Sequence, residues 1–197
     1  MGQEAEAYRL GELNKETEFV LKNIGVEAPK MVNTLDAGAE VVLVDHNAKS
    51  QAIDGLETLK VKCIIDHHSV ESLSTSEPIQ LRFDPVCSTC SILFLMFAEQ
   101  DLEIPDHVAK MILAGILSDS LAFRSPTTTE EDREIAEYLA EDLGIAFPRM
   151  QDLWRIPCAR TPTLASTISI RRPSMKRAPS SFACCVLSLA TKLSSPA

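Results

Sequence analysis

The chain has 197 residues, of which 45% are apolar, and its 28 acidic residues against 19 basic ones give a net charge of -9. No run approaches the roughly 20 apolar residues that span a bilayer, and the excess of acid argues against binding nucleic acid by charge alone. Neither a membrane nor a nucleic-acid partner is therefore predicted. The first residues lack the features of a secretory signal, so the six cysteines are predicted to be free thiols of a cytoplasmic protein.

The N-terminal part predicts a short strand followed by helical segments. The strand is expected at 7–11. Asn14 is a suitable cap for a helix that ends near Gly25, because an Asn side chain accepts a hydrogen bond from the first turn and Gly adopts the left-handed conformation of a helix end. A second, short helical turn is expected after Pro29.

Two unbroken apolar runs predict the centre of a parallel sheet. They lie at 41–45 and 61–66, and a helix-like segment at 51–59 separates them. Strands that are buried on both faces have such continuous apolar sequences. The order strand, helix, strand predicts a parallel pair.

The remaining elements are an edge strand and three helices. Alternating apolar and polar residues at 79–83 predict the edge strand. Ser88 is expected to cap an apolar helix at 92–98 that must be buried, and Pro105 to open a helix that runs into residues 117–120. The pattern predicts a capping box between Thr128 and Glu131. It starts a helix that has Ile135, Leu139 and Leu143 on one face and stops at Gly144.

These elements predict an α/β domain, with a parallel sheet flanked by helices, over residues 1–154. The composition changes after it: residues 158–197 contain six basic residues and no acidic ones. We interpret residues 155–197 as a Ser/Thr/Pro-rich basic tail that is disordered, irregular, or translated from a shifted reading frame.

Asp and His residues directly follow both buried strands, as Asp45-His46 and Asp66-His67-His68. Parallel strands end at the same edge of a sheet, where open α/β sheets build their binding sites. Carboxylate oxygens suit Mg²⁺ and Mn²⁺, and imidazole shifts the preference toward Mn²⁺ or other transition metals. A single Asp at a strand end is more often a cap or turn residue, but the repeated pattern favours a metal site.

Three further positions carry weaker signals. Asp119 is predicted at the end of an apolar helix, where the helix dipole disfavours a negative charge, so a nearby cation or an exposed loop would explain it. Cys87 and Cys90 have the spacing of redox and zinc motifs, but small residues at the start of a buried helix are the favoured interpretation. His107 is predicted at the surface.

Four motifs together suggest a family: Val-Asp-His-Asn at 44–47, Ile-Asp-His-His at 65–68, Ile-Leu-Ser-Asp-Ser at 116–120 and Ser-Pro-Thr-Thr-Thr at 125–129. With these motifs, residues 7–154 resemble the manganese-dependent family II inorganic pyrophosphatases of the DHH phosphoesterase superfamily.

The resemblance implies a role for each matching residue. Asp45, His67 and Asp119 match metal ligands. His68 and His46 would contact the substrate, and His68 and Asp66 would be the catalytic residues, with Asp66 supporting its neighbours. The implied cofactor is Mn²⁺, as two ions, with Mg²⁺ or Co²⁺ as alternatives. The implied activity is hydrolysis of pyrophosphate by a water molecule that the two ions activate, in a protein that forms a homodimer.

The sequence also departs from the family. The family opens with a strand and a Gly-His-x-x-Pro-Asp-x-Asp loop, and a second domain grips the phosphates; neither stretch is found here. We therefore predict a DHH-type domain without its first strand and with weak or no activity. The alternatives are another phosphodiesterase or an exopolyphosphatase of the superfamily, or a non-catalytic DHH-like binding module.

Overall fold

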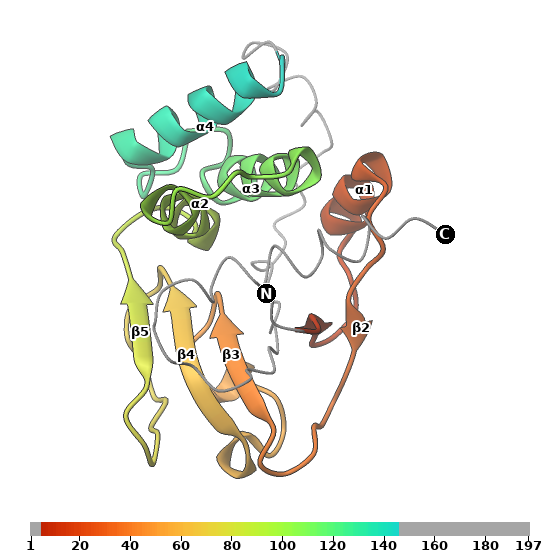
Figure 1. Cartoon of the computed structure of the whole chain (residues 1–197), viewed down its shortest axis with the longest axis vertical. Helices are drawn as coiled ribbons and strands as arrows, with labels where there is room; N and C mark the ends of the chain where they lie inside the picture. Colours follow the sequence, from red (N-terminus) through yellow and green to blue (C-terminus); the bar gives the residue numbers. More distant parts are fainter. Residues whose placement is uncertain (1–4, 146–197) are drawn as a thin grey trace.

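Three parallel strands form the main sheet of this computed structural model, which describes residues 5–145. They are β3 (Glu40–Val44), β4 (Lys60–Asp66) and β5 (Gln80–Phe83), in the order β3-β4-β5 (Figure 1). A separate pair of two-residue strands, β1 (Tyr8–Arg9) and β2 (Lys30–Met31), is also parallel. All three strands of the main sheet therefore end on the same side.

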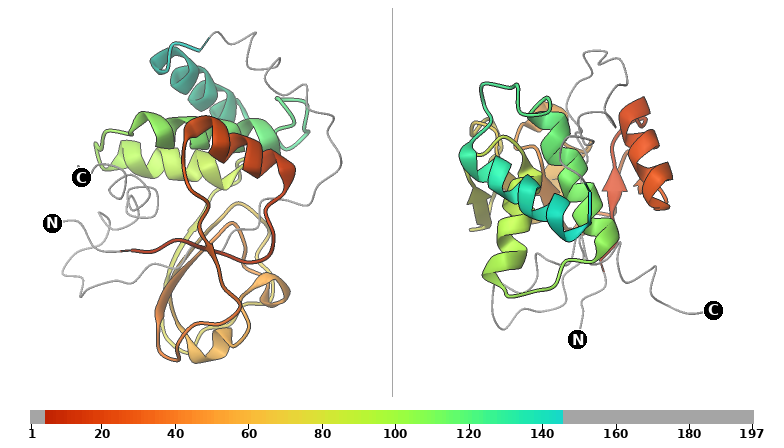
Figure 2. Two further views of the ribbon diagram at one scale, coloured as in Figure 1. Left: turned by 90° about the vertical axis from the view of Figure 1, so that its right-hand side faces the viewer. Right: turned by 90° about the horizontal axis from the view of Figure 1, so that it is seen from above.

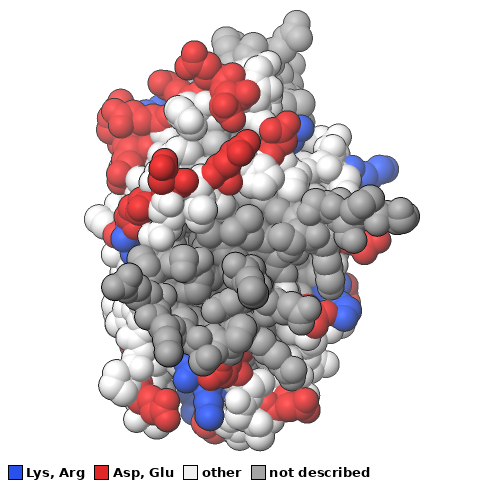
Figure 3. All heavy atoms as spheres, in the orientation of Figure 1, with Lys and Arg blue, Asp and Glu red and all other residues white. Residues whose placement is uncertain are grey.

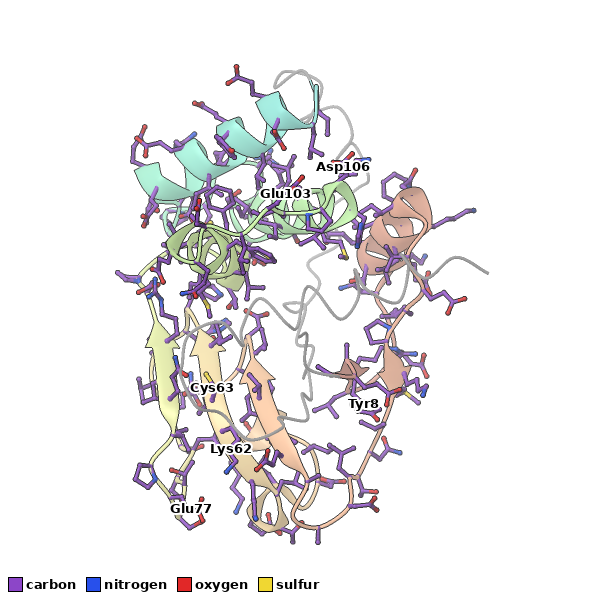
Figure 4. All side chains as sticks on the ribbon, viewed as in Figure 1. Tyr8, Lys62, Cys63, Glu77, Glu103 and Asp106 are labelled. Atoms are coloured by element: carbon purple, nitrogen blue, oxygen red, sulfur yellow. The ribbon has the colours of Figure 1, made fainter. Side chains whose placement is uncertain are left out.

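The apolar runs of β3 and β4 are buried on both faces of the sheet. Val42 and Val44 pack in one core cluster with Cys63, which Figure 4 labels on β4, whereas Leu43 and its neighbours pack in a second cluster on the opposite face. A register shift between Val41 and Val42 sets Cys63 opposite Val42. This two-sided burial explains why neither strand alternates between apolar and polar residues.

The helices lie beyond the carboxyl ends of the strands. The first to follow the sheet, α2 (Thr89–Glu99), packs against β4, α3 (Asp106–Asp119) and α4 (Glu130–Asp142). The helix α1 (Lys15–Ile24) packs against α3 (Figures 1 and 2). The start of α2 and the end of α3 can therefore contribute side chains next to the strand ends.

These observations confirm the predicted fold class, an α/β domain with parallel strands and flanking helices. The short strand near residues 7–11, both buried strands, the edge strand and the four helices are present. Ser88, Asn14 and Pro105 precede helices as expected. The predicted tail at 155–197, and with it the predicted domain boundary, lies outside the described residues.

Three local predictions were wrong. Residues Lys30–Met31 form β2 instead of a helical turn, because their backbone pairs with β1. The segment 51–59 contains no α-helix; two 3₁₀ turns, Lys49–Gln51 and Leu56–Thr58, flank Gly55, whose φ of 77° breaks the helical path. The capping box pairs Thr129 with Asp132, one residue after the predicted pair.

Among residues 5–145, no helix is long and apolar enough to cross a membrane. Acidic side chains gather over α4 in Figure 3. The exposed acidic residues of that helix are Glu130, Glu131, Glu134, Glu137, Glu141 and Asp142. Its outer face is therefore strongly negative.

A glycine allows α2 and α3 to approach each other closely. A Cβ atom at Gly115 of α3 would lie 2.3 Å from Sγ and 3.2 Å from Cβ of Cys90 on α2. The smallest side chain is thus required at this crossing, next to the residues that begin α2.

We expect Gly115→Ala to lower the free energy of unfolding by about 1–3 kcal/mol, the usual cost of an overpacked core. Removing the sulfur with Cys90→Ala should recover part of this loss, and urea denaturation of the two single variants and the double variant measures the coupling. An equal loss in both Cys90 backgrounds would show that the crossing is not the cause.

Candidate metal centre

Asp45 directly follows β3 and has an unusual backbone conformation. Its φ is 67°, a left-handed value that Asp adopts more readily than most residues. Its N–H donates to the carbonyl oxygen of Ile65 at 2.9 Å, and its Oδ1 accepts from Thr89 Oγ1 at 2.7 Å. The carboxylate is therefore held where β3, β4 and α2 meet.

Asp66 ends β4 and is fully buried. Its carboxylate accepts hydrogen bonds from Asn47 Nδ2 at 2.6 Å and from the backbone N–H groups of His67 and His68 at 2.8 and 3.1 Å. His68 Nδ1 lies 2.7 Å from the same carboxylate. Burial alone would raise the pKa of Asp66, but these bonds hold it below its ordinary value. Asp66 thus holds the backbone of His67 and His68 and the ring of His68 in place.

His67 offers an unpaired nitrogen toward Asp45. Its Nδ1 lies 3.1 Å from the carbonyl oxygen of Val86, which can only accept, so Nδ1 carries the proton and Nε2 carries the lone pair. Nε2 is buried without a hydrogen-bond partner, 3.6 Å from Asp45 Oδ1. Burial is the main cause that lowers the pKa of His67, and the charge of the nearby His68 is the next. The lowered pKa favours the neutral ring that binds metals.

The other two histidines are placed differently. The His68 side chain is 40% exposed, so its ring is open to solvent while Nδ1 contacts Asp66. His46 is buried, and its Nδ1 lies 3.0 Å from the carbonyl oxygen of Val44. Its predicted contact with substrate stays a prediction.

Asp119 reaches the same region from the last residue of α3. Its Oδ2 accepts from Ser88 Oγ at 2.6 Å, and Ser88 directly precedes the threonine that binds Asp45. Burial raises the pKa of Asp119 to about 6 and that of Asp45 to about 7, and the charge of Asp119 adds to the shift of Asp45. The nearby His68 and the hydroxyl hydrogen bonds offset only part of this effect of burial on the two carboxylates.

The donor set fits a divalent cation. Asp45, His67 and His68 each offer a ligand atom, and these atoms lie within 4.8 Å of one another. The unpaired imidazole nitrogen and the destabilised carboxylates are groups that a cation would satisfy. Asp119 is outside this cluster, although Ser88 and Thr89 connect it to Asp45.

The remaining sequence predictions concern Cys87, Cys90 and His107. Both cysteines are free and lie where α2 begins. Burial raises the pKa of each thiol well above its ordinary value, which disfavours a reactive thiolate. His107 is half-buried, and its Nε2 lacks a partner among the described residues, so the prediction of a surface position was wrong.

Sequence reasoning missed three residues that contact the site or support it. Thr89 and Asn47 bind Asp45 and Asp66, and Asp132 holds the start of α2. Ser88 was predicted only as a helix cap. The sequence Ser-Thr at the start of an apolar helix was a signal for the hydroxyl contacts, but it did not indicate their partners.

A parallel sheet with carboxylates and imidazoles at its carboxyl ends defines this chain as an α/β domain with a candidate divalent-metal centre. Residues 5–116 match the N-terminal domain of the DHH family, and the chain belongs to that family.

Similar proteins carry a more specific name. The chain is 46% identical over 144 residues to the Deinococcus radiodurans protein named probable manganese-dependent inorganic pyrophosphatase, covering 73% of this chain and 46% of that protein. A protein of the same name from Oceanobacillus iheyensis is 41% identical over 145 residues, with 74% and 47% covered. The chain therefore spans about half the length of these relatives.

A solved structure has the same fold. The crystal structure of the Methanococcus jannaschii putative family II inorganic pyrophosphatase superimposes with a TM-score of 0.69 at 41% identity. The match covers 74% of this chain and 50% of the other.

The raised pKa of Asp45 predicts a pH-dependent stability in the absence of metal. The unfolded chain loses this proton near pH 3.8, whereas the folded chain keeps it up to about pH 7. The folded state thus binds more protons in this interval, and Asp45 increasingly opposes folding as the pH rises from about 4 to about 7. Asp45→Asn should therefore stabilise the metal-free chain by roughly one to a few kcal/mol at pH 8 and have little effect at pH 4.

Thermal unfolding of both proteins across this pH range, in the presence of a chelator, measures the effect. Asp54→Asn is the matched control, because Asp54 lies on the surface. A difference between Asp45→Asn and the unsubstituted chain that does not change with pH would contradict the assigned burial effect.

Proposed function

We propose that this domain provides one part of the metal site of a pyrophosphate-hydrolysing enzyme. The observation that carries the proposal is the unpaired His67 Nε2, which faces Asp45 at 3.6 Å across the ends of β4 and β3. A buried imidazole lone pair beside a carboxylate has no purpose in packing, but it suits a divalent cation. The names of the similar proteins support manganese and pyrophosphate as the metal and the substrate.

In this proposal Asp45, His67 and Asp119 bind the metal ions, which are Mn²⁺, with Mg²⁺ or Co²⁺ as alternatives. Bound divalent cations would neutralise phosphate charge and make water a stronger nucleophile at neutral pH. The carboxylates approach from two elements, β3 and α3, and the imidazole follows β4. Each ligand is thus held by a different part of the fold.

The exposed His68 is proposed to contact the substrate. Its Nδ1 is engaged with Asp66, so in its doubly protonated form it can donate from Nε2 to a phosphate oxygen. Asp66 is proposed to act through His68 instead of touching the substrate, because it is buried and bonded to its neighbours. It orients His68 through the contact with Nδ1.

The first test is Mn²⁺-dependent release of phosphate from pyrophosphate by the chain, with Asp119→Ala as the test variant. We expect slow hydrolysis, since only part of the family's ligand set is matched, and a loss of about 100-fold or more when a metal-binding carboxylate is removed. Asp106→Ala is the control, because Asp106 is exposed and lies at the opposite end of α3 (Figure 4).

Equal rates for Asp119→Ala and Asp106→Ala would contradict the role of Asp119. If the unsubstituted chain neither hydrolyses pyrophosphate nor binds Mn²⁺, the proposed function is wrong. Hydrolysis of a linear oligonucleotide in preference to pyrophosphate would instead indicate another phosphoesterase of the superfamily.

A further inference from the structure

The start of α2 contacts both carboxylates of the candidate centre through consecutive residues. Thr89 Oγ1 donates to Asp45 Oδ1 at 2.7 Å, and Ser88 Oγ donates to Asp119 Oδ2 at 2.6 Å. Both hydroxyl-bearing residues are buried, with 3% and 0% of their surface exposed. A single short segment therefore sets the orientation of two carboxylates that come from different elements of the fold.

The direction of the bond from Ser88 is fixed by its neighbours. Its Oγ accepts from the N–H of Cys90 at 3.2 Å, so the hydroxyl proton is free to point at Asp119. In each carboxylate one oxygen is bonded to a hydroxyl, and the other oxygen has no hydrogen bond among the described residues. The Asp45 oxygen that Thr89 holds is also the one that lies 3.6 Å from His67 Nε2. Hydrogen bonds of this kind usually orient the ligands of a bound metal.

A buried acid on another helix holds this segment in place. Asp132 Oδ2 accepts from the N–H of Cys87 at 3.0 Å, and its Oδ1 accepts from Ser91 Oγ at 2.6 Å. The same carboxylate accepts from the N–H and the hydroxyl of Thr129 at 2.8 and 2.7 Å, as part of the capping box of α4. The Asp132 side chain thus caps α4 and also binds residues on both sides of the Ser88-Thr89 pair.

The charge of Asp132 suits this position. Asp132 is fully buried, and it faces the N-terminal ends of α2 and α4, where unpaired N–H groups give a partial positive charge. A neutral side chain of the same shape would lose this attraction and leave at least one donor without an acceptor. The start of α2 is therefore rigid for a physical reason that lies outside the centre itself.

We propose that Thr89 and Ser88 are positioning residues that direct Asp45 and Asp119 toward bound metal, and that Asp132 keeps both hydroxyls in register with those carboxylates. This inference rests on the proposed metal site. Neither hydroxyl touches the metal or the substrate in this proposal; each acts through the carboxylate that it binds. Removing a hydroxyl should therefore weaken metal binding while the ligands themselves remain.

The test measures Mn²⁺ affinity by the electron paramagnetic resonance signal of free Mn²⁺, using the full 197-residue chain. Thr89→Val, which replaces the hydroxyl by a methyl group, should raise the Kd about 10- to 100-fold, the usual effect of losing a partner of a metal ligand. Thr89→Ser, which keeps the hydroxyl, should restore most of the affinity. Thr128→Val is the matched control, because Thr128 Oγ1 has no hydrogen-bond partner among the described residues.

Two more variants extend the test to the other contacts. Ser88→Ala should weaken Mn²⁺ binding through Asp119. Asp132→Asn should weaken it too, although the hydrogen bonds of Asp132 go to Cys87, Ser91 and Thr129 and to neither carboxylate. Thermal unfolding without metal identifies any variant that fails to fold, and the comparison of Thr89→Val with Thr89→Ser then decides the question.

The outcomes separate this inference from the proposed function. If the unsubstituted chain binds no Mn²⁺, the proposed metal site is wrong and the positioning role falls with it. If the unsubstituted chain binds Mn²⁺ and Thr89→Val binds it equally well, the site stands and the positioning role is wrong. The role is also wrong if Thr128→Val loses as much affinity as Thr89→Val.

Discussion

The parallel pairing of β3 with β4 is the constraint on which the candidate centre depends. Val44 lies opposite Ile65, and the N–H of Asp45 continues the ladder by donating to the carbonyl oxygen of Ile65. Asp45 and the Asp66-His67-His68 sequence must then emerge together at one edge of the sheet. The two-sided apolar packing of these strands fixes the pairing, because a slip of one residue would turn their side chains to the wrong faces.

The helices make this edge a buried environment, with consequences for charge. α2 and α3 bring Thr89, Ser88 and Asp119 over the strand ends, and burial raises the pKa values of both Asp45 and Asp119. Each carboxylate is therefore costly in its ionised form without a cation. Asp66 and Asp132 show the contrast, because several hydrogen bonds keep the pKa of each below its ordinary value. The fold thus separates acids that support structure from acids that need a partner.

The sequence predicted the strand ends well because continuous apolar runs and the Asp-His residues after them are local signals. It could not predict the left-handed φ of Asp45, which results from the contacts of three elements. The capping box was displaced by one residue because Thr128 with Glu131 fits the general pattern as well as Thr129 with Asp132. The buried partners Cys87 and Ser91 favour Asp132, whereas Glu131 is exposed. The 3₁₀ turns around Gly55 were missed since apolar anchors such as Ile53 and Leu56 occur in helices as well.

In the proposed centre, the ends of β3, β4 and α3 form one metal site. The most direct measurement is an anomalous difference map, recorded at the manganese absorption edge, from crystals of the chain grown with Mn²⁺. We expect a peak enclosed by Asp45, His67 and Asp119, with His67 Nε2 as a ligand. A map with no peak at this edge of the sheet, or with His67 Nε2 turned away from the ion, would contradict it.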